Sequence, residues 1–207
     1  LSMPGNRSCD LVACGRYDSG QRVIIVDAAQ WRRLDPGHLG EIWVQGEGIA
    51  DGYYRHPEEN TRFHTTLAGE QGDWLRTGDL GFVFEGQIFV VGRSHDRLVI
   101  HGRNLFAHDI EWGLIDLDPD LGRCVAFAGE STDQLVVIQE LAARHSPNDH
   151  LRLILNVRRR IFTQMGIEPD AVVLVPHGTI PFTTSGKPRR VRCRELFLRG
   201  ELVCLMQ

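Results

Sequence analysis

The chain has 207 residues, of which 42% are hydrophobic and 24% charged, and this composition excludes a disordered tail, a collagen and a disulfide-stapled miniprotein. Its 23 basic and 27 acidic residues leave a net charge of −4, so no basic field across the whole chain indicates nucleic-acid binding. No apolar run reaches membrane-spanning length and the N-terminus lacks a signal-peptide pattern, so we expect a cytoplasmic protein with no nucleic-acid partner and no membrane insertion.

The first half of the chain is typical of β-structure. Runs rich in Val, Ile and Trp alternate with turn residues such as Asp35-Pro36-Gly37. The pair Glu85-Gly86 between two apolar runs predicts a two-residue hairpin turn. One short helical turn is expected at residues 57–61. The predicted strands are residues 21–27, 40–45, 82–84 and 87–91.

After Gly92 strands and helices alternate, which predicts a small α+β domain that begins between residues 92 and 96. The sequence Ser146-Pro147-Asn148-Asp149 is typical of a helix N-cap followed by proline at the first helical position. That helix is expected to end at Gly166, because glycine favours the left-handed C-cap. The predicted strands are 97–100, 123–128, 134–139 and 171–175, and the predicted helices are 109–117, 147–165 and 189–198.

Charge is divided unequally along the chain. Residues 1–150 hold 13 basic and 23 acidic side chains, whereas residues 151–207 hold 10 basic and four acidic ones. The run Arg158-Arg159-Arg160 is either a solvated helix face or a face for phosphates or an acidic partner, and the sequence leaves both open. The five cysteines are scattered without a CxxC pair, so neither a disulfide framework nor a metal site is predicted.

Three short segments have side chains suited to nucleotide chemistry. Asp79, in a glycine-containing segment, could accept hydrogen bonds from a ribose diol, or it could stabilise a turn. Arg93, at the end of the predicted hairpin, could reach ribose or phosphate oxygens, or form a surface salt bridge. Lys187, the single lysine, comes directly after the polar stretch Thr183–Gly186. Its ammonium could move towards negative charge that develops on a phosphate, or it could be an ordinary loop lysine.

Taken in order, four motifs resemble those of the adenylate-forming superfamily of acyl and aminoacyl activating enzymes. A strand-and-loop motif is followed by ribose-binding, hinge and C-terminal lysine motifs, and a chance match of all four in this order is improbable. Within the superfamily the chain is most similar to fatty acyl-AMP ligases, through Gly78–Phe82, Gly102–Asn104 with Asp109–Glu111, and Cys193-Arg194 with Phe197-Leu198. The four motifs are Gly40–Val44 with Gly52–Tyr54, Arg76–Leu80, Gly92–Asp96 with Gly102, and Thr184–Lys187.

The resemblance implies two domains. Residues 1–94 match the barrel-side end of the N-terminal adenylation domain, and residues 95–207 match its small mobile C-terminal domain. The implied activity is ATP-dependent conversion of a fatty acid to an acyl-adenylate, which is passed to the phosphopantetheine thiol of an acyl carrier protein. ATP and Mg are expected to be bound mainly by upstream residues that are absent here, so this fragment alone is predicted to be inactive.

The resemblance also implies roles for single residues. Lys187 is expected to contact carboxylate and α-phosphate oxygens during adenylate formation, and His95 occupies the hinge position. Two alternatives stay open: a catalytically silent module of the same fold that docks a carrier protein, and an acyl-CoA ligase or amino-acid adenylation domain. The remaining expected sites are Asp79, Arg93 and Val90 for ATP or adenylate, and Gly102, Arg103 and Asn104 on the carrier side.

Overall fold

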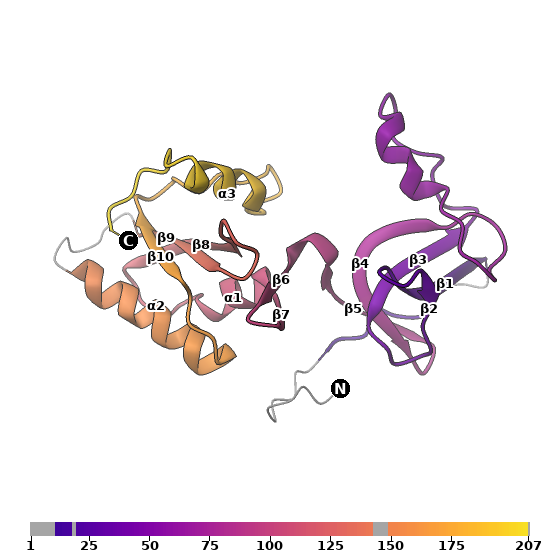
Figure 1. Cartoon of the computed structure of the whole chain (residues 1–207), viewed down its shortest axis with the longest axis horizontal. Helices are drawn as coiled ribbons and strands as arrows, with labels where there is room; N and C mark the ends of the chain where they lie inside the picture. Colours follow the sequence, from indigo (N-terminus) through magenta and orange to yellow (C-terminus); the bar gives the residue numbers. More distant parts are fainter. Residues whose placement is uncertain (1–10, 18–19, 143–148, 207) are drawn as a thin grey trace. The chain divides into compact units, whose positions relative to one another are not determined.

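A computed structural model describes residues 11–17, 20–142 and 149–206 of the chain (Figure 1). The chain divides into two compact units, Leu1–His95 and Asp96–Gln207. Both contain sheets and the second adds helices, so the predicted α+β class is confirmed. Within the described residues no helix is both long enough and apolar enough to cross a membrane.

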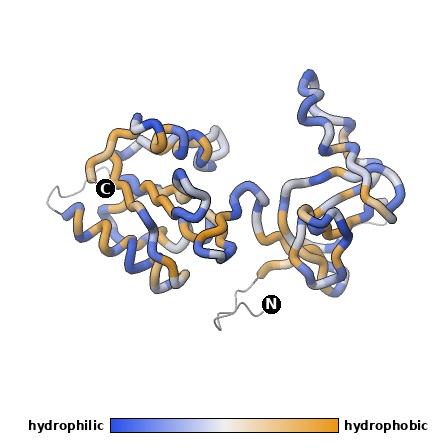
Figure 2. The backbone as a smooth tube through the Cα atoms, in the orientation of Figure 1, coloured by the Kyte–Doolittle hydropathy of each residue, from blue (hydrophilic) through white to orange (hydrophobic). Residues whose placement is uncertain are grey.

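The first unit is built on an antiparallel five-stranded sheet in the order β2-β1-β3-β4-β5. This sheet is open: among the described residues its outer strands β2 and β5 are not paired with each other, so it does not close into a barrel. A 3-10 helix, η1 (Pro57–Phe63), has no buried residue and is largely hydrophilic (Figure 2). The strands are β1 (Gln21–Asp27), β2 (Arg32–Arg33), β3 (Gly40–Gly46), β4 (Leu75–Phe84) and β5 (Gln87–Arg93).

Residues on both faces of β1 and β3 form the core of the first unit. Trp43 and Trp74 are fully buried with Val26 in one cluster, whereas Ile25 and Ile42 belong to a second cluster. This explains the continuous apolar run in β1, because a strand buried on both faces does not alternate.

The predicted hairpin is confirmed, since Glu85 and Gly86 both have positive φ, as a tight two-residue turn requires. β4 begins at Leu75 and not at residue 82. β3 pairs with Leu75 and Arg76 and again with Leu80 and Gly81, and residues 77–79 between these pairs form an irregularity in which Gly78 has a φ of 74°.

The second unit has a three-stranded sheet in the order β10-β9-β8, with helices on both faces. β8 and β9 are antiparallel, whereas β9 and β10 are parallel, and α2 forms the crossover between them (Figure 1). A separate hairpin of β6 and β7 precedes α1. The elements are η2 (Ser94–Asp96), β6 (Arg97–Ile100), β7 (Arg103–Phe106), α1 (Ala107–Gly113), β8 (Leu121–Ala128), β9 (Leu135–Leu141), α2 (His150–Met165), β10 (Ala171–Val175) and α3 (Arg190–Leu198).

Two predicted helix boundaries need correction. α1 begins two residues before the predicted start and ends at Gly113, although Ile110 and Leu114 pack into the core as their spacing predicts. α2 begins at His150 with Asp149 as N-cap, and the predicted cap residues 146–148 lie outside the described residues. The C-terminal prediction for α2 is confirmed, because Gly166 adopts a φ of 67° and donates its N–H to the Phe162 carbonyl oxygen.

Candidate functional site

Asp79 and Arg93 lie opposite each other across β4 and β5. The two-residue turn sets a register for the outer half of this hairpin, and if continued that register would place Gly92 opposite Asp79. A bulge between Leu80 and Gly81 shifts the pairing by one residue and brings Arg93 there. The two candidate residues are therefore neighbours because of an irregularity in the sheet.

The two side chains form an ion pair at the surface. Nε of Arg93 lies 3.0 Å from Oδ1 of Asp79, and the side chains are 52% and 30% exposed. Within the part of the chain that the structure describes, Oδ2 of Asp79 and the terminal nitrogens of Arg93 have no hydrogen-bond or ion-pair partner. One carboxylate oxygen and two nitrogens thus remain to bind a polar ligand.

The segment before Asp79 is held by a buried carboxylate. Glu41 on β3 is 4% exposed, and its Oε2 accepts hydrogen bonds from Nε and Nη2 of Arg76 at 3.2 and 3.0 Å. Its Oε1 accepts the Gly78 backbone N–H at 3.2 Å. The Thr77 hydroxyl donates to a β3 carbonyl oxygen at 2.7 Å and accepts the Asp79 N–H at 3.0 Å.

A shallow pocket lies beside this segment in the first unit. It has a volume of about 280 Å³, and guanidinium groups of three arginines contribute to its wall. Arg62 also donates to the carbonyl oxygens of residues 76 and 77, at 3.1 and 2.7 Å. Such a wall suits an anionic ligand. The lining residues are Glu41, Arg62, Arg76, Thr77, Gly78, Arg93, Ser94 and His95.

The other two expected residues of the first unit are placed differently. His95 is exposed and lines the pocket. Val90 is 42% exposed and lies opposite Gly81 in the hairpin, but it is not part of the pocket wall.

In the second unit Lys187 ends a small closed loop. The Thr183 N–H donates to the Lys187 carbonyl oxygen at 2.8 Å, and the Lys187 N–H donates to Oγ1 of Thr183 at 3.1 Å. Gly186 has a φ of 80°, and its N–H donates to the Thr183 carbonyl oxygen. The Lys187 side chain is exposed and has no ion-pair partner among the described residues. The loop therefore fixes the backbone and leaves the ammonium free to approach a ligand.

The segment leading to this loop is anchored to the sheet. Glu140 on β9 is 1% exposed, and its Oε1 accepts the Ile180 N–H at 2.7 Å. Phe182 stacks under the guanidinium of Arg123, whose central carbon lies 4.4 Å from the ring centroid. These contacts hold the irregular segment 180–182 before the loop, so they fix where the backbone of the loop lies in the second unit.

An ion-pair cluster that sequence reasoning missed joins the start of the second unit to α3. Arg190 donates to both oxygens of Glu111, at 2.9 and 2.6 Å, and to Oδ1 of Asp96 at 3.0 Å. Burial lowers the pKa of Arg190, but hydrogen bonds and charges of the two carboxylates raise it above its ordinary value overall. These partners lie 79 and 94 residues away along the chain, so no local pattern could indicate them.

The expected carrier-side residues occupy the turn between β6 and β7 and its exit. Gly102 has a φ of 71° and is exposed, as is Asn104. Arg103 donates from Nη1 to the carbonyl oxygens of Met165 and Gly166 at 2.8 and 3.3 Å. Arg103 thus supports the C-terminal end of α2, while Gly102 and Asn104 remain accessible.

Among the described residues one group has the composition of a metal site. His56, Glu58 and Glu59 offer ligand atoms that lie within 4.8 Å of one another. All three are exposed and sit at the start of η1, where acidic side chains are common without a metal. We assign no metal to this group.

Curated proteins similar in sequence to this chain include two fatty-acid ligases. The chain is 36% identical over 199 residues to the medium-chain-fatty-acid–[acyl-carrier-protein] ligase JamA of Moorena producens, covering 93% of this chain and 34% of that protein. It is 39% identical over 193 residues to the long-chain-fatty-acid–AMP ligase FadD23 of Mycobacterium tuberculosis, covering 88% and 33%. The chain belongs to the adenylate-forming enzyme superfamily.

Solved structures agree with this membership. A structure from a study of fatty acyl-adenylate ligases of E. coli and L. pneumophila covers 96% of this chain with a TM-score of 0.77 and 26% identity. The McyG A-PCP structure with phenylalanyl-adenylate covers 92% with a TM-score of 0.76 and 25% identity. The chain spans about a third of the length of the curated relatives it matches. No protein-family model matches it.

Proposed function

We propose that this chain is the C-terminal portion of an AMP-forming fatty acyl ligase. The complete enzyme would convert a fatty acid and ATP to an acyl-adenylate and pass the acyl group to the phosphopantetheine thiol of an acyl carrier protein. The observation that carries the proposal is the Asp79–Arg93 pair beside a pocket walled by arginines. Relatives named as fatty-acid ligases support the substrate class.

Asp79 and Arg93 would bind the sugar of the nucleotide. The unpartnered oxygen of Asp79 accepts hydrogen bonds from the ribose hydroxyls, and the terminal nitrogens of Arg93 donate to ribose or phosphate oxygens. Because the ion pair already orients both groups, little side-chain entropy is lost on binding. Val90, which is exposed on the same strand, would pack against the nucleoside.

Lys187 would act in the first half-reaction only. Attack of the fatty acid carboxylate on the α-phosphorus of ATP forms the acyl–phosphate bond and releases pyrophosphate, and negative charge grows on the phosphate oxygens. An ammonium on an exposed loop can stabilise that charge in the transition state. His95, the last residue of the first unit, would be the hinge that withdraws Lys187 before the thiol attacks the acyl-adenylate.

The acceptor thiol has two candidates. JamA is named as a ligase for an acyl carrier protein, which supports the carrier. Another relative, fadD25 of Mycobacterium tuberculosis, is 38% identical over 208 residues and is named a putative fatty-acid–CoA ligase, which supports coenzyme A as the alternative. Thioester formation with each thiol, measured side by side in the full-length ligase, separates them. Gly102 and Asn104 would lie on the side of the acceptor.

The test of the proposal is the Lys187→Ala variant of the full-length ligase. Pyrophosphate release should fall by about 100- to 1,000-fold, since one charge-stabilising group in the transition state contributes this much. The matched control is Arg199→Ala, which removes an exposed cation from the end of α3. It should retain the wild-type rate. A wild-type rate in Lys187→Ala would falsify the role of the lysine, and pyrophosphate release by the isolated 207-residue chain would contradict the fragment assignment.

A further inference from the structure

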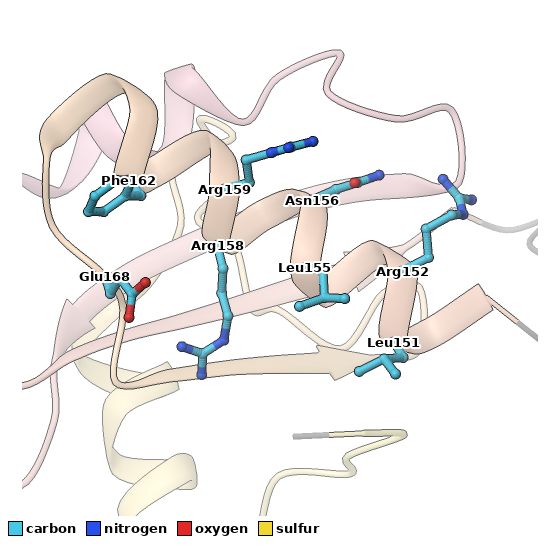
Figure 3. Close-up of a pocket in the computed structure, with 8 residues that line it drawn as sticks. All are labelled: Leu151, Arg152, Leu155, Asn156, Arg158, Arg159, Phe162 and Glu168. Atoms are coloured by element: carbon cyan, nitrogen blue, oxygen red, sulfur yellow. The ribbon is translucent and has the colours of Figure 1, made fainter.

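An apolar groove runs along the outer face of α2 in the second unit. It has a volume of about 760 Å³. Figure 3 shows Leu151 and Leu155 along one side of the helix, with Phe162 near its end and Glu168 beside it. Arg152, Asn156, Arg158 and Arg159 complete the lining.

This face of α2 exposes more large apolar side chains than a helix face in contact with water normally does. Leu151, Leu155 and Phe162 are 59%, 56% and 55% exposed, although the opposite face of α2 already supplies the core. Intervals of four and seven residues put the three on one stripe of the helix. A stripe of leucine and phenylalanine flanked by arginine has the composition of a protein interface.

The charges around the groove are positive and partly uncompensated. α2 contains four arginines and no acidic residue. Arg152 is paired with Asp118 at 2.6 Å and with Asp149 at 3.3 Å, so the acidic partners gather at the start of the helix. Arg158 donates to the carbonyl oxygen of Pro169 at 2.7 Å, a neutral partner that does not compensate the positive charge of the guanidinium.

Near Phe162, at the C-terminal end of α2, few acidic side chains compensate the positive charge. Arg159 is exposed, and among the described residues it has neither an ion-pair nor a hydrogen-bond partner. Glu168 is the one acidic residue in the wall and makes no ion pair within the described part of the chain. The groove therefore combines an apolar floor with a net positive rim.

The arginines of α3 provide no comparable surface. Arg190 is bound by Glu111 and Asp96, and Arg194 donates to the carbonyl oxygens of residues 128 and 129 at 2.8 Å each. Arg192 pairs with Glu195 at 3.1 Å. The three arginines of α3 thus each have a partner in the second unit, whereas Arg159 on α2 is exposed without one among the described residues.

We propose that the α2 groove docks a protein partner that presents acidic side chains around an apolar ridge. Resting on the proposed function, that partner is the acyl carrier protein. The apolar side chains distinguish a protein from a simple phosphate, which would use the arginines and leave Leu155 and Phe162 exposed. The groove is concave and includes an acidic residue, and both features fit a protein ridge better than a flat anionic membrane.

The experiment measures binding of a purified, phosphopantetheinylated acyl carrier protein to the 207-residue chain by titration calorimetry. Arg159→Glu and Phe162→Ser should each weaken binding at least about tenfold, as interface anchors do. The matched controls are Arg199→Glu and Val191→Ser, on α3, where Val191 is 72% exposed. They should bind within twofold of wild type (about 0.4 kcal/mol, from RT ln 2). A photo-crosslinker at Leu155 should capture the carrier.

Several results would overturn the proposal. It fails if the carrier does not bind, or if both groove variants bind as the wild type does. Sensitivity to Arg159→Glu without sensitivity to Phe162→Ser would make the groove an anion site only, and tighter binding to phosphatidylglycerol vesicles than to the carrier would make it a membrane surface. The assay needs neither ATP nor fatty acid, so its outcome is independent of the Lys187 test.

Discussion

Substitution of Glu41 tests whether a buried carboxylate holds the segment that carries Asp79. Glu41 is 4% exposed and accepts three hydrogen bonds, two from Arg76 and one from the Gly78 N–H. Glu41→Ala removes all three acceptor contacts. Glu41→Gln keeps the shape and one carbonyl acceptor but removes the charge.

The magnitude follows from what each donor loses. The Arg76 side chain is 36% exposed and can regain water, so its charged hydrogen bonds contribute only about 1–2 kcal/mol after solvent screening. The Gly78 N–H is part-buried and would lose its partner at a cost of about 1–2 kcal/mol. We therefore expect Glu41→Ala to lower the free energy of unfolding of the first unit by about 3 kcal/mol, and Glu41→Gln by about half of that.

Tryptophan fluorescence during urea denaturation is a direct assay of the first unit. Trp43 and Trp74 are fully buried there, whereas Trp112 of the second unit is 70% exposed and changes little on unfolding. A loss of about 3 kcal/mol corresponds to a fall of roughly 2 M in the urea midpoint for a unit of this size. Faster hydrogen exchange of the Gly78 amide should accompany it.

Glu47, which is exposed just after β3, provides the control. Glu47→Ala should stay within about 0.5 kcal/mol of wild type. The reasoning is refuted if Glu41→Ala and Glu41→Gln also fall within that range, because the carboxylate would then not support the segment.

Further substitutions probe both units. Arg190→Ala should destabilise the second unit by about 3 kcal/mol in urea denaturation followed by circular dichroism, because it removes the guanidinium that pairs with two partly buried carboxylates; an unchanged midpoint would contradict this. Burial first, and the Glu111 carboxylate second, raise the pKa of Cys124 from 9.0 to about 12, so the folded chain holds this proton more tightly than the unfolded chain does. Its contribution to stability is therefore fully present below pH 9 and lost as pH rises towards 12, and Cys124→Ala should flatten that decline in denaturation midpoints measured from pH 8 to 11. Gly81→Ala should cost about 3 kcal/mol because the new Cβ would overlap the Phe89 carbonyl oxygen. Gly78→Ala, at a φ of 74° with only ordinary van der Waals contacts around the new Cβ, should cost about 1 kcal/mol, and equal thermal shifts of the two variants would contradict this reasoning.

Local sequence patterns predicted much of the secondary structure. The end of α2 at Gly166 and the Glu85-Gly86 hairpin depend on contacts within a few residues, so sequence sufficed for them. The start of β4 was predicted wrongly, because Thr77-Gly78-Asp79 is turn-like by itself, and the strand continues through it only because β3 pairs with the residues on either side. Propensity is a weak guide where a neighbouring strand supplies the hydrogen bonds.

The sequence alone determined which residues could carry nucleotide chemistry, since Asp79, Arg93 and the single lysine stand out by type and order. Their surroundings were decided by the tertiary structure. Hairpin geometry by itself would place Gly92 beside Asp79, and only the bulge next to Gly81 brings the guanidinium of Arg93 within 3.0 Å of the carboxylate. A one-residue slip in a strand depends on packing against the neighbouring strand, and that information is not local in the sequence.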